Sequence, residues 1–455
     1  MSTREKKEIE QLKKDAVEYI IPHFANYEEL TKEPKIFVKG EGCYIYDIEG
    51  NKYLDTFASL LTTICGHGRE EVANAAYEQM KQLEFFPNFA DTFTLPLIKL
   101  AKKLKEITPG ELSVSFFINS GSEANETAIK MAKQYFWNKG KKRKYKILAR
   151  RYSYHATTLG GISATGIPWF REYFEPLLPG FIFAMSAQCF HCELGLDPSS
   201  CGLTCLKEME KIIQWENPES IAGIIIDPIP GSNTGYPLPP EGYLEGLRAL
   251  CDRYEILLIF DEVQTGFGKT GKWFACEHWA VTPDIMTLGK GLTGGYLPLG
   301  VTITTPKVYE VFRAPGAELR SGSTYGGHTT ACATTLANIE IIEKEHLVEK
   351  AAQMGIYIKD RLNKLYEKYS IVGDIRGIGM LWAVELLADR KTKKSLDSKL
   401  KIGSWIRDYC WKKGMILRNN ADILVLAPAL IMTKEQIDFM IDLVDEAIGE
   451  VIKTF

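Results

Sequence analysis

The stretch Ile256-Leu257-Leu258-Ile259-Phe260, followed directly by Asp261, decides the fold. A short apolar run without alternation is typical of a strand that is buried on both faces of a parallel sheet. Four more such runs lie along the chain, at Val114–Ile118, Tyr145–Ala149, Ile221–Ile226 and Ile285–Leu288. Segments with a helical pattern, such as Glu123–Phe136 and Gly242–Tyr254, separate them. This alternation predicts an α/β domain with a mostly parallel sheet flanked by helices.

The two ends of the chain have a different pattern. Residues 5–20 predict a charged amphipathic helix, and residues 36–54 predict short antiparallel strands. Beyond residue 330 the pattern is α+β, with helices expected at Ala331–Glu343 and Ile402–Lys413 and strands at Ile371–Ile375, Met380–Leu386 and Ile423–Leu426. Thr433 and Gln436 have the spacing of a capping box at the start of the last helix. We therefore predict a large domain at 61–329 and a smaller α+β domain at 330–455, to which the segment 1–60 also belongs.

Composition narrows the class of protein. The chain has 455 residues and a formal net charge of -3, so it lacks the basic surface that nucleic acids or anionic membranes attract. Its charged first fifteen residues are unlike a signal peptide. A cytoplasmic protein without nucleic-acid or membrane partners is expected.

The ten cysteines are expected to be reduced thiols in such a protein. Four of them, Cys189, Cys192, Cys201 and Cys205, stand close together and resemble a structural zinc site. The interval between the two pairs is shorter than in common zinc ribbons, and the second pair is C-x3-C. A reduced loop without metal is therefore the favoured interpretation, with zinc as the alternative.

Polar residues follow three of the expected strands, where ligands collect in open α/β sheets. Gly121 and Ser122 begin a helix after the first strand, and their amides could hold a phosphate. Asp261 could keep a pyridine nitrogen protonated, which would make a cofactor ring an electron sink. Each has a structural alternative, because a glycine, serine or aspartate can also cap a helix or turn.

Lys290 lies between two glycines at the end of the strand Ile285–Leu288. A lone lysine is usually a solvated surface charge, but a desolvated amine at a strand end is nucleophilic enough for Schiff-base chemistry. Gly121-Ser122, Asp261 and Lys290 follow in order on separate strands. Their combination is more specific than any one of them.

The runs Asp261–Gly268 and Pro283–Gly291 closely resemble the signature of class III (omega-type) aminotransferases. The resemblance extends from about residue 35 to 450 and is closest to the omega-amino acid:pyruvate and taurine:pyruvate branch. It implies fold type I of the enzymes that depend on pyridoxal 5'-phosphate (PLP).

The resemblance also implies the role of each site residue. Lys290 would hold PLP as a Schiff base and move the proton, while Asp261 would pair with the pyridinium nitrogen. The remaining cofactor residues are Val263 and Tyr154 with His155 at the ring faces, Gln264 at the phenolic oxygen, Gly121 and Ser122 at the phosphate, Asp227 in a supporting contact, and Thr324 at the partner subunit's phosphate. A homodimer with a shared active site follows, which could pair into a tetramer.

Residues at the substrate are less constrained by the resemblance. Arg418 falls where the family binds a substrate carboxylate, with a surface salt bridge as the alternative. Leu61 stands where related enzymes often carry an aromatic residue, and Phe86 and Phe89 would line the same pocket or belong to the core. Asp227 replaces a common glutamate, so a longer or water-bridged contact is expected there.

The expected reaction is a ping-pong transamination from an omega-amino acid or amino-sulfonate, such as β-alanine or taurine, to pyruvate. The nearest alternative is a 2-oxoglutarate-dependent 4-aminobutyrate or ornithine-type aminotransferase. A decarboxylase or aminomutase is less favoured. A non-catalytic dimeric scaffold is opposed by the presence of Lys290, Asp261 and Gln264.

Overall fold

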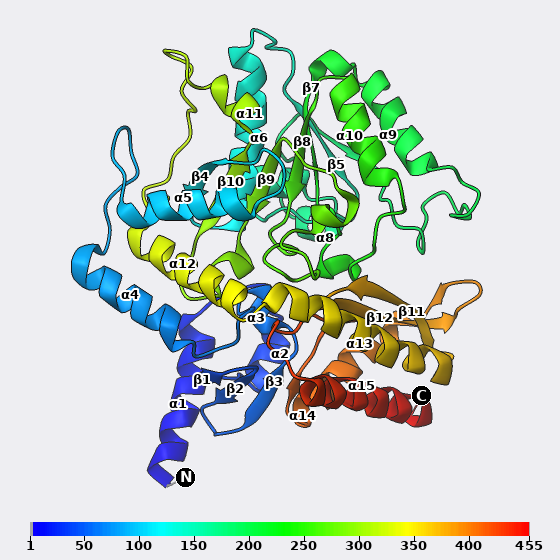
Figure 1. Ribbon diagram of the computed structural model, residues 1–455. Coiled ribbons are helices and arrows are strands. Elements are labelled where there is room, and N and C mark those ends of the chain that lie inside the picture. The colour runs from blue at the N-terminus through cyan, green and yellow to red at the C-terminus, as the bar shows by residue number, and fades with distance from the viewer. Residues whose placement is uncertain (1–2, 455) are drawn as a thin grey trace.

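A seven-stranded sheet forms the upper half of the molecule in the computed structural model, which describes residues 3–454 (Figure 1). Its order is β4-β10-β9-β8-β7-β5-β6, and only β10 runs antiparallel to its neighbours. The strands are β4 (Val114–Ile118), β5 (Lys146–Arg150), β6 (Phe181–Ala184), β7 (Ile221–Ile226), β8 (Leu257–Asp261), β9 (Ile285–Leu288) and β10 (Gly300–Thr304). The predicted mostly parallel sheet is confirmed.

Helices cover both faces of this sheet, which explains why its central strands are apolar throughout. All six residues of β7 are buried, as expected for a strand with helices on either side. The long helix α6 packs against β7, β8, β9 and β10. The helices of this half are α5 (Leu95–Ile107), α6 (Gly121–Asn138), α7 (Leu159–Ala164), α8 (Pro168–Arg171), α9 (Thr204–Trp215), α10 (Tyr243–Arg253) and α11 (Pro306–Glu310).

Segments from the two ends of the chain meet in the lower half (Figure 1). The antiparallel strands β1 (Phe37–Glu41), β2 (Tyr44–Asp47) and β3 (Lys52–Asp55) pair as predicted, and β3 is also joined in parallel by β14 (Met415–Ile416). A second sheet has the order β11-β12-β16-β15, with β13 beside β12. Its strands are β11 (Val372–Ile378), β12 (Leu381–Asp389), β13 (Lys394–Ser395), β15 (Arg418–Asn420) and β16 (Ile423–Leu426).

The remaining helices connect and cover these sheets. They are α1 (Thr3–Tyr19), α2 (Tyr27–Lys32), α3 (Ala58–Leu61), α4 (Glu70–Leu83), α12 (Thr329–Lys344), α13 (Leu347–Lys368), α14 (Ile402–Lys412) and α15 (Lys434–Thr454). The capping box before α15 is confirmed, because the amide of Thr433 donates to Gln436 Oε1 at 3.0 Å and the amide of Gln436 to Thr433 Oγ1 at 3.3 Å. None of the helices in residues 3–454 is long and apolar enough to cross a membrane.

Candidate active site

The polar residues at the strand ends converge on one cavity of about 190 Å³ at the carboxyl edge of the parallel strands. Nine predicted site residues line it: Gly121, Ser122, Tyr154, His155, Asp227, Asp261, Val263, Gln264 and Lys290. Three further residues, Asn125, Ile229 and Gly231, were not predicted from the sequence. Topology explains the convergence, because parallel neighbouring strands all deliver their following loops to the same edge.

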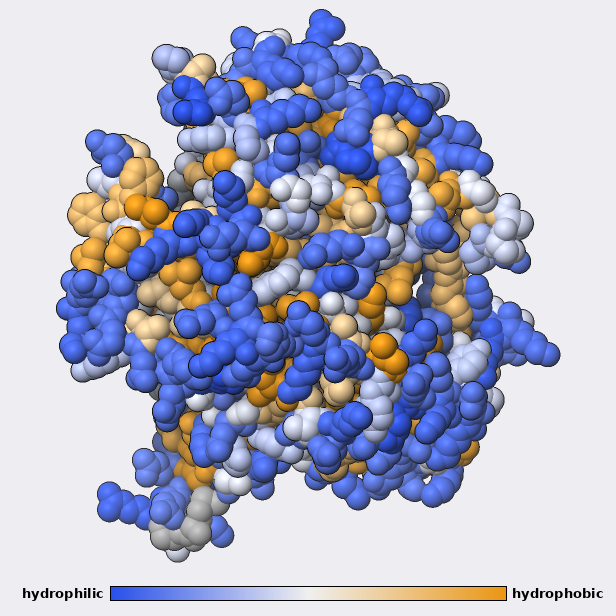
Figure 2. Space-filling model, in the orientation of Figure 1, coloured by the Kyte–Doolittle hydropathy of each residue, from blue (hydrophilic) through white to orange (hydrophobic). Residues whose placement is uncertain are grey.

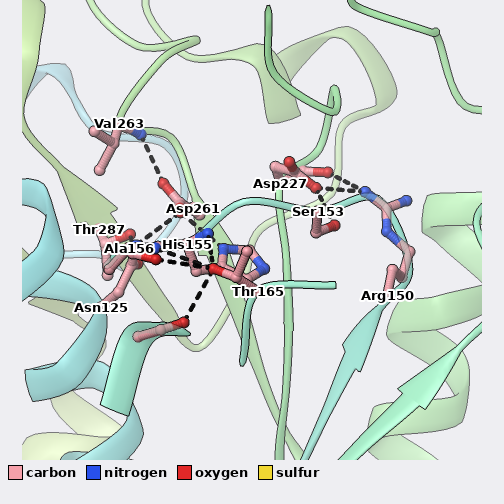
Figure 3. Close-up of polar contacts among 11 residues, drawn as sticks. Asn125, Arg150, Ser153, His155, Ala156, Thr165, Asp227, Asp261, Val263 and Thr287 are labelled. Atoms are coloured by element: carbon pink, nitrogen blue, oxygen red, sulfur yellow. Dashed lines mark hydrogen bonds and ion pairs between the residues drawn. The ribbon is translucent and has the colours of Figure 1, made fainter. Parts of the chain in front are cut away.

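Asp261 lines this cavity and is held in place by a polar network (Figure 3). Its Oδ2 accepts a hydrogen bond from Asn125 Nδ2 at 2.7 Å and lies 2.8 Å from His155 Nδ1. Its Oδ1 accepts from the amide of Val263 at 3.1 Å. Asn125 is itself oriented by Thr287, whose hydroxyl donates to Asn125 Oδ1 at 2.7 Å. The carboxylate is therefore fixed in both position and direction.

The predicted residue Asp227 lies in a second polar cluster beside the first (Figure 3). It pairs with Arg150 Nη2 at 2.9 Å and accepts from Ser153 Oγ at 2.7 Å. Both contacts are direct, and the longer or water-bridged contact expected from the sequence for this carboxylate stays a prediction. Burial alone would raise the pKa of Asp227, but the guanidinium of Arg150 lowers it, so this carboxyl stays ionised.

Lys290 begins a short turn directly after β9, and its backbone is in the left-handed region with φ +46°. A lysine in this conformation is strained and depends on its surroundings to hold it. The neighbouring Gly289 approaches the backbone of Gly121 so closely that a Cβ there would lie 3.3 Å from it. Burial lowers the pKa of Lys290 to about 8, so its amine loses its proton far more readily than a surface lysine.

The turn before α6 forms the opposite end of the cavity. Ser120 caps this helix by accepting a hydrogen bond from the amide of Glu123 at 3.2 Å. The amides of Gly121 and Ser122 belong to the first helical turn, which has no carbonyl partners within the helix. A Cβ on Gly121 would lie 2.7 Å from Val263 Cγ1, so only glycine fits at this position.

Two predicted ring neighbours are also held in place. Gln264 Oε1 accepts from the amide of Ser232 at 3.2 Å, and a Cβ on Gly231 would lie 2.3 Å from Gln264 Nε2. The ring of Tyr154 packs against Phe170, with ring centroids 4.9 Å apart. Thr324 does not line the cavity and is exposed on the surface.

Arg418 lies on β15 and does not line the cavity, but its charge acts on Lys290 and Tyr154, which do. Its Nη2 donates to Asn233 Oδ1 at 3.4 Å, and its guanidinium carbon lies 5.1 Å from the ring centroid of Phe57. Burial lowers its pKa, and the charges that act on it belong to Tyr236 and Tyr154. The surface salt bridge considered from the sequence is therefore wrong, because Arg418 faces aromatic rings.

The expected pocket residues differ in burial. Leu61 is buried in an apolar cluster with Phe57, Tyr236 and Ile229, the last of which lines the cavity. Phe86 and Phe89 are 46% and 54% exposed and do not line the cavity within one chain. The core alternative for these two phenylalanines is therefore wrong.

The four neighbouring cysteines lie apart from this site. All four line one small recess of about 30 Å³ in the loop between β6 and α9, and all are free thiols. Within residues 3–454 no three or more His, Cys, Asp or Glu side chains are grouped so as to hold a metal ion.

The sequence profile of the aminotransferase class-III family matches residues 27–448, and the chain belongs to this family. It is therefore a PLP-dependent aminotransferase of fold type I. The cavity fits that cofactor, since it presents a desolvated amine, a buried fixed carboxylate and the amides of a helix start.

Relatives with known names cover nearly the whole chain. The chain is 36% identical to a taurine–pyruvate aminotransferase of Bilophila wadsworthia, over 96% of both proteins. It is 35% identical to a putrescine–pyruvate aminotransferase of Pseudomonas aeruginosa, over 94% of each, and 38% identical to an adenosylmethionine-8-amino-7-oxononanoate aminotransferase of Geobacter sulfurreducens, over 92% of the chain and 93% of the relative.

Solved structures of transaminases also superpose closely on this chain. The (S)-enantioselective omega-transaminase of Thermomicrobium roseum superposes with a TM-score of 0.94 at 38% identity, over 97% of this chain and 98% of that one. An aminotransferase of Bacillus anthracis gives a TM-score of 0.93 at 36% identity, over 99% and 100%.

We predict that Gly121→Ala weakens PLP binding. The new methyl group would overlap Val263 and displace the amides at the helix start. Overpacking of about 1–3 kcal/mol corresponds to roughly a tenfold loss of affinity or more. Fluorescence titration of the apoprotein with PLP measures the dissociation constant. Gly140→Ala is the control for general loss of stability, because it adds backbone strain at φ +77° beyond the other end of α6 and its Cβ meets no atom within 4 Å. Equal affinities in the two variants would contradict the prediction.

The lowered pKa of Lys290 predicts how PLP capture depends on pH. Its amine must be neutral to attack a carbonyl carbon, so the rate should rise with pH up to about 8 and level off above it. Borohydride reduction at timed intervals, followed by peptide mapping, reports the fraction of Lys290 that has reacted. Lys290→Ala should remain folded and trap no adduct at any pH. A rate that keeps rising towards pH 10 would show an amine with an ordinary pKa.

Proposed function

We propose that this aminotransferase moves the amino group of an omega-amino acid or amino-sulfonate, of the taurine or β-alanine type, to pyruvate by a ping-pong mechanism. The observation that carries the proposal is Arg418. It is a half-buried guanidinium close to the cavity, and the groups that act on its charge are tyrosines rather than a carboxylate.

The residues at the strand ends supply the chemistry common to both half-reactions. Bound PLP provides a protonated ring that withdraws electrons from the substrate carbon which loses its proton. Asp261 would face the ring nitrogen and stabilise its proton, and Gly121 and Ser122 would hold the phosphate. Lys290 Nζ would bind the cofactor and then carry the proton, which its lowered pKa allows near neutral pH.

Arg418 would select the donor by binding the acid group at the end of the donor that does not carry the reacting amine. A guanidinium presents a planar pair of donors that matches a carboxylate or a sulfonate. Its Nε is buried and has no hydrogen-bond partner within residues 3–454, so an anion there would satisfy a group that is otherwise costly to bury. Leu61 packs with Phe57 and Tyr236 in one buried cluster, at a position where related enzymes often carry a larger aromatic residue.

Pyruvate as the acceptor is supported by the names of two relatives, the taurine–pyruvate and putrescine–pyruvate aminotransferases. Their different donors, and the third relative's different name, show that identity near 35–38% does not decide the donor. The donor proposal therefore rests on Arg418.

We further propose a homodimer in which each subunit completes the site of the other. Thr324 is exposed beside Ser323, which accepts a hydrogen bond from Asn119 at 2.6 Å, close to the helix start. Apolar side chains gather on the surface near α4 and α5, at the left of Figure 2: Tyr77, Met80, Leu83, Phe86, Phe89, Phe93, Leu95 and Ile98. Eight exposed apolar side chains gathered in one region are typical of a protein–protein interface. We also propose that residues 61–329 form the large domain and that residues 1–60 and 330–455 form the small one. A cytoplasmic location is proposed as well.

A panel of donors and acceptors tests the branch of the family. With taurine or β-alanine as donor, pyruvate should give a kcat/KM at least about tenfold higher than 2-oxoglutarate. Pyruvate has one carboxylate for the single guanidinium of Arg418, whereas the second carboxylate of 2-oxoglutarate would have no such partner. Alanine formation, followed by chromatography, measures turnover with pyruvate. Faster turnover with 4-aminobutyrate and 2-oxoglutarate would favour the alternative branch.

Arg418→Leu should raise KM for taurine and β-alanine by roughly tenfold to a hundredfold, the value of about 1.5–3 kcal/mol of a charged hydrogen bond. The kcat/KM for a neutral aromatic amine should fall far less, because such a donor has no anion. Arg253→Leu is the control, since that arginine is exposed and pairs with Glu210 on the surface. Equal losses for charged and neutral donors would remove Arg418 from donor selection.

A further inference from the structure

The loop between β6 and α9, residues 185–203, has no regular secondary structure and carries a group of thiols. Cys189, Cys192 and Cys201 lie in it, and Cys205 lies in the first turn of α9. We call these four residues the thiol cluster. All four are half-buried, whereas the other six cysteines are buried in the core.

The thiols of the cluster lie close to one another. All four line the same recess of about 30 Å³, whose other walls include Leu194, Pro198 and Pro240. Burial raises the pKa of Cys189, and charges on Cys201 and Cys192 raise it further. Charges on Cys189 and Cys201 likewise act on Cys205. Each pair of cysteines thus lies within electrostatic reach of the other pair.

The loop of the thiol cluster is tied to the lower half of the molecule. His191 Nε2 lies 2.6 Å from Glu385 Oε1 on β12, and Glu385 in turn pairs with Arg376 at 2.5 Å. Arg376 Nη2 donates to the carbonyl of Thr234 at 2.9 Å. The residue before Thr234 is Asn233, which accepts the hydrogen bond from Arg418. Four consecutive contacts therefore connect this loop with Arg418.

A second connection leads from the cluster towards the cofactor cavity. Tyr243 is fully buried, which raises its pKa, and the charges of Arg150 and Cys205 also act on it. Arg150 lies with its guanidinium carbon 5.9 Å from the centroid of the Tyr243 ring and pairs with Asp227, which lines the cavity. Cys205 therefore lies within electrostatic reach of a ring that neighbours the Arg150–Asp227 pair.

We propose that the thiol cluster is a redox modification site, at which Cys189 and Cys201 form a disulfide by exchange with a low-molecular-weight disulfide. These two cysteines come from different pairs and line one recess, and of the neighbouring thiols Cys201 acts most strongly on Cys189. A bond between them would close the irregular loop. The loop can supply the small movement that bond formation needs, because irregular surface segments open at low cost.

The exchange is balanced without any further oxidant. One cysteine loses its proton and attacks a sulfur of the small disulfide, whose S–S bond breaks and releases one thiol that takes up a proton. The second cysteine then attacks the mixed disulfide. The Cys189–Cys201 bond forms, and a second thiol leaves with the second proton. Two protein thiols are oxidised, and one small disulfide is reduced to two thiols.

The experiment uses the full chain loaded with PLP and incubated with oxidised glutathione. Remaining thiols are alkylated under denaturing conditions, and the protein is cleaved after glutamate without reduction. Glu193 lies between the two cysteine pairs, so cleavage there leaves the two peptides joined only if a disulfide bridges them. Mass spectrometry should show the joined peptide, lighter by about 2 Da than the sum of its reduced parts.

Matched variants identify the pair. Cys192→Ser should keep the joined peptide, whereas Cys189→Ser and Cys201→Ser should lower its yield at least about tenfold. Circular dichroism checks that each variant is folded. Separate peptides in the wild-type chain would overturn the proposal, and loss of the bridge in Cys192→Ser would overturn the pairing. Zinc bound in equimolar amount by the isolated protein, with thiols that oxidise only after chelation, would show a metal site in place of a redox site.

Discussion

The buried carboxylate of Asp261 is the constraint on which the rest of the site depends. It is 6% exposed, and a buried charge is tolerated only when its oxygens are hydrogen-bonded. Its partners come from α6, from the segment after β5 and from its own turn. Asn125 also accepts a hydrogen bond from Thr287 of β9, so this strand is joined to the same network. The elements that carry the Gly121-Ser122 turn, His155 and Lys290 are therefore aligned by one network.

The same network explains why the site tolerates strain. Lys290 has a left-handed backbone, which costs about 1–3 kcal/mol for a residue with a side chain. Gly289 and Gly121 approach each other closely at that point, so the strand end and the helix start pack as one unit. A rigid surrounding can hold an amine in an unfavourable conformation, and the desolvation that lowers its pKa comes with the same packing.

Much of this arrangement could be predicted from the sequence, because strands that are buried on both faces are apolar throughout. Val114–Ile118, Ile221–Ile226 and Ile285–Leu288 have the bounds expected, and Leu257–Asp261 is displaced by one residue. The strand β10 was not predicted. Its threonines look exposed in the sequence, but Thr302 is fully buried, since its hydroxyl donates to the carbonyl of Ala124 at 2.8 Å.

The residues that sequence reasoning missed depend on tertiary partners. Asn125 lies within a helix, where an asparagine carries no signal of its own, and its importance appears only when Asp261 is placed beside it. A possible signal was its position four residues after Gly121, which puts both on one helix face. For Phe86 and Phe89 only the core alternative was wrong, because apolar character alone does not show whether a side chain is covered; their place at the substrate pocket stays a prediction.

The residues that we propose for the reaction and for donor selection lie in different parts of the chain. Asp261, Lys290 and the Gly121-Ser122 turn follow three strands of one sheet, β8, β9 and β4, and line one cavity, so a change in any of them alters a shared site. Arg418 and Leu61 come from β15 and α3, outside that sheet. They can vary without altering the strand ends. Such a separation of the two groups of residues would explain why relatives at 35–38% identity carry different donors in their names.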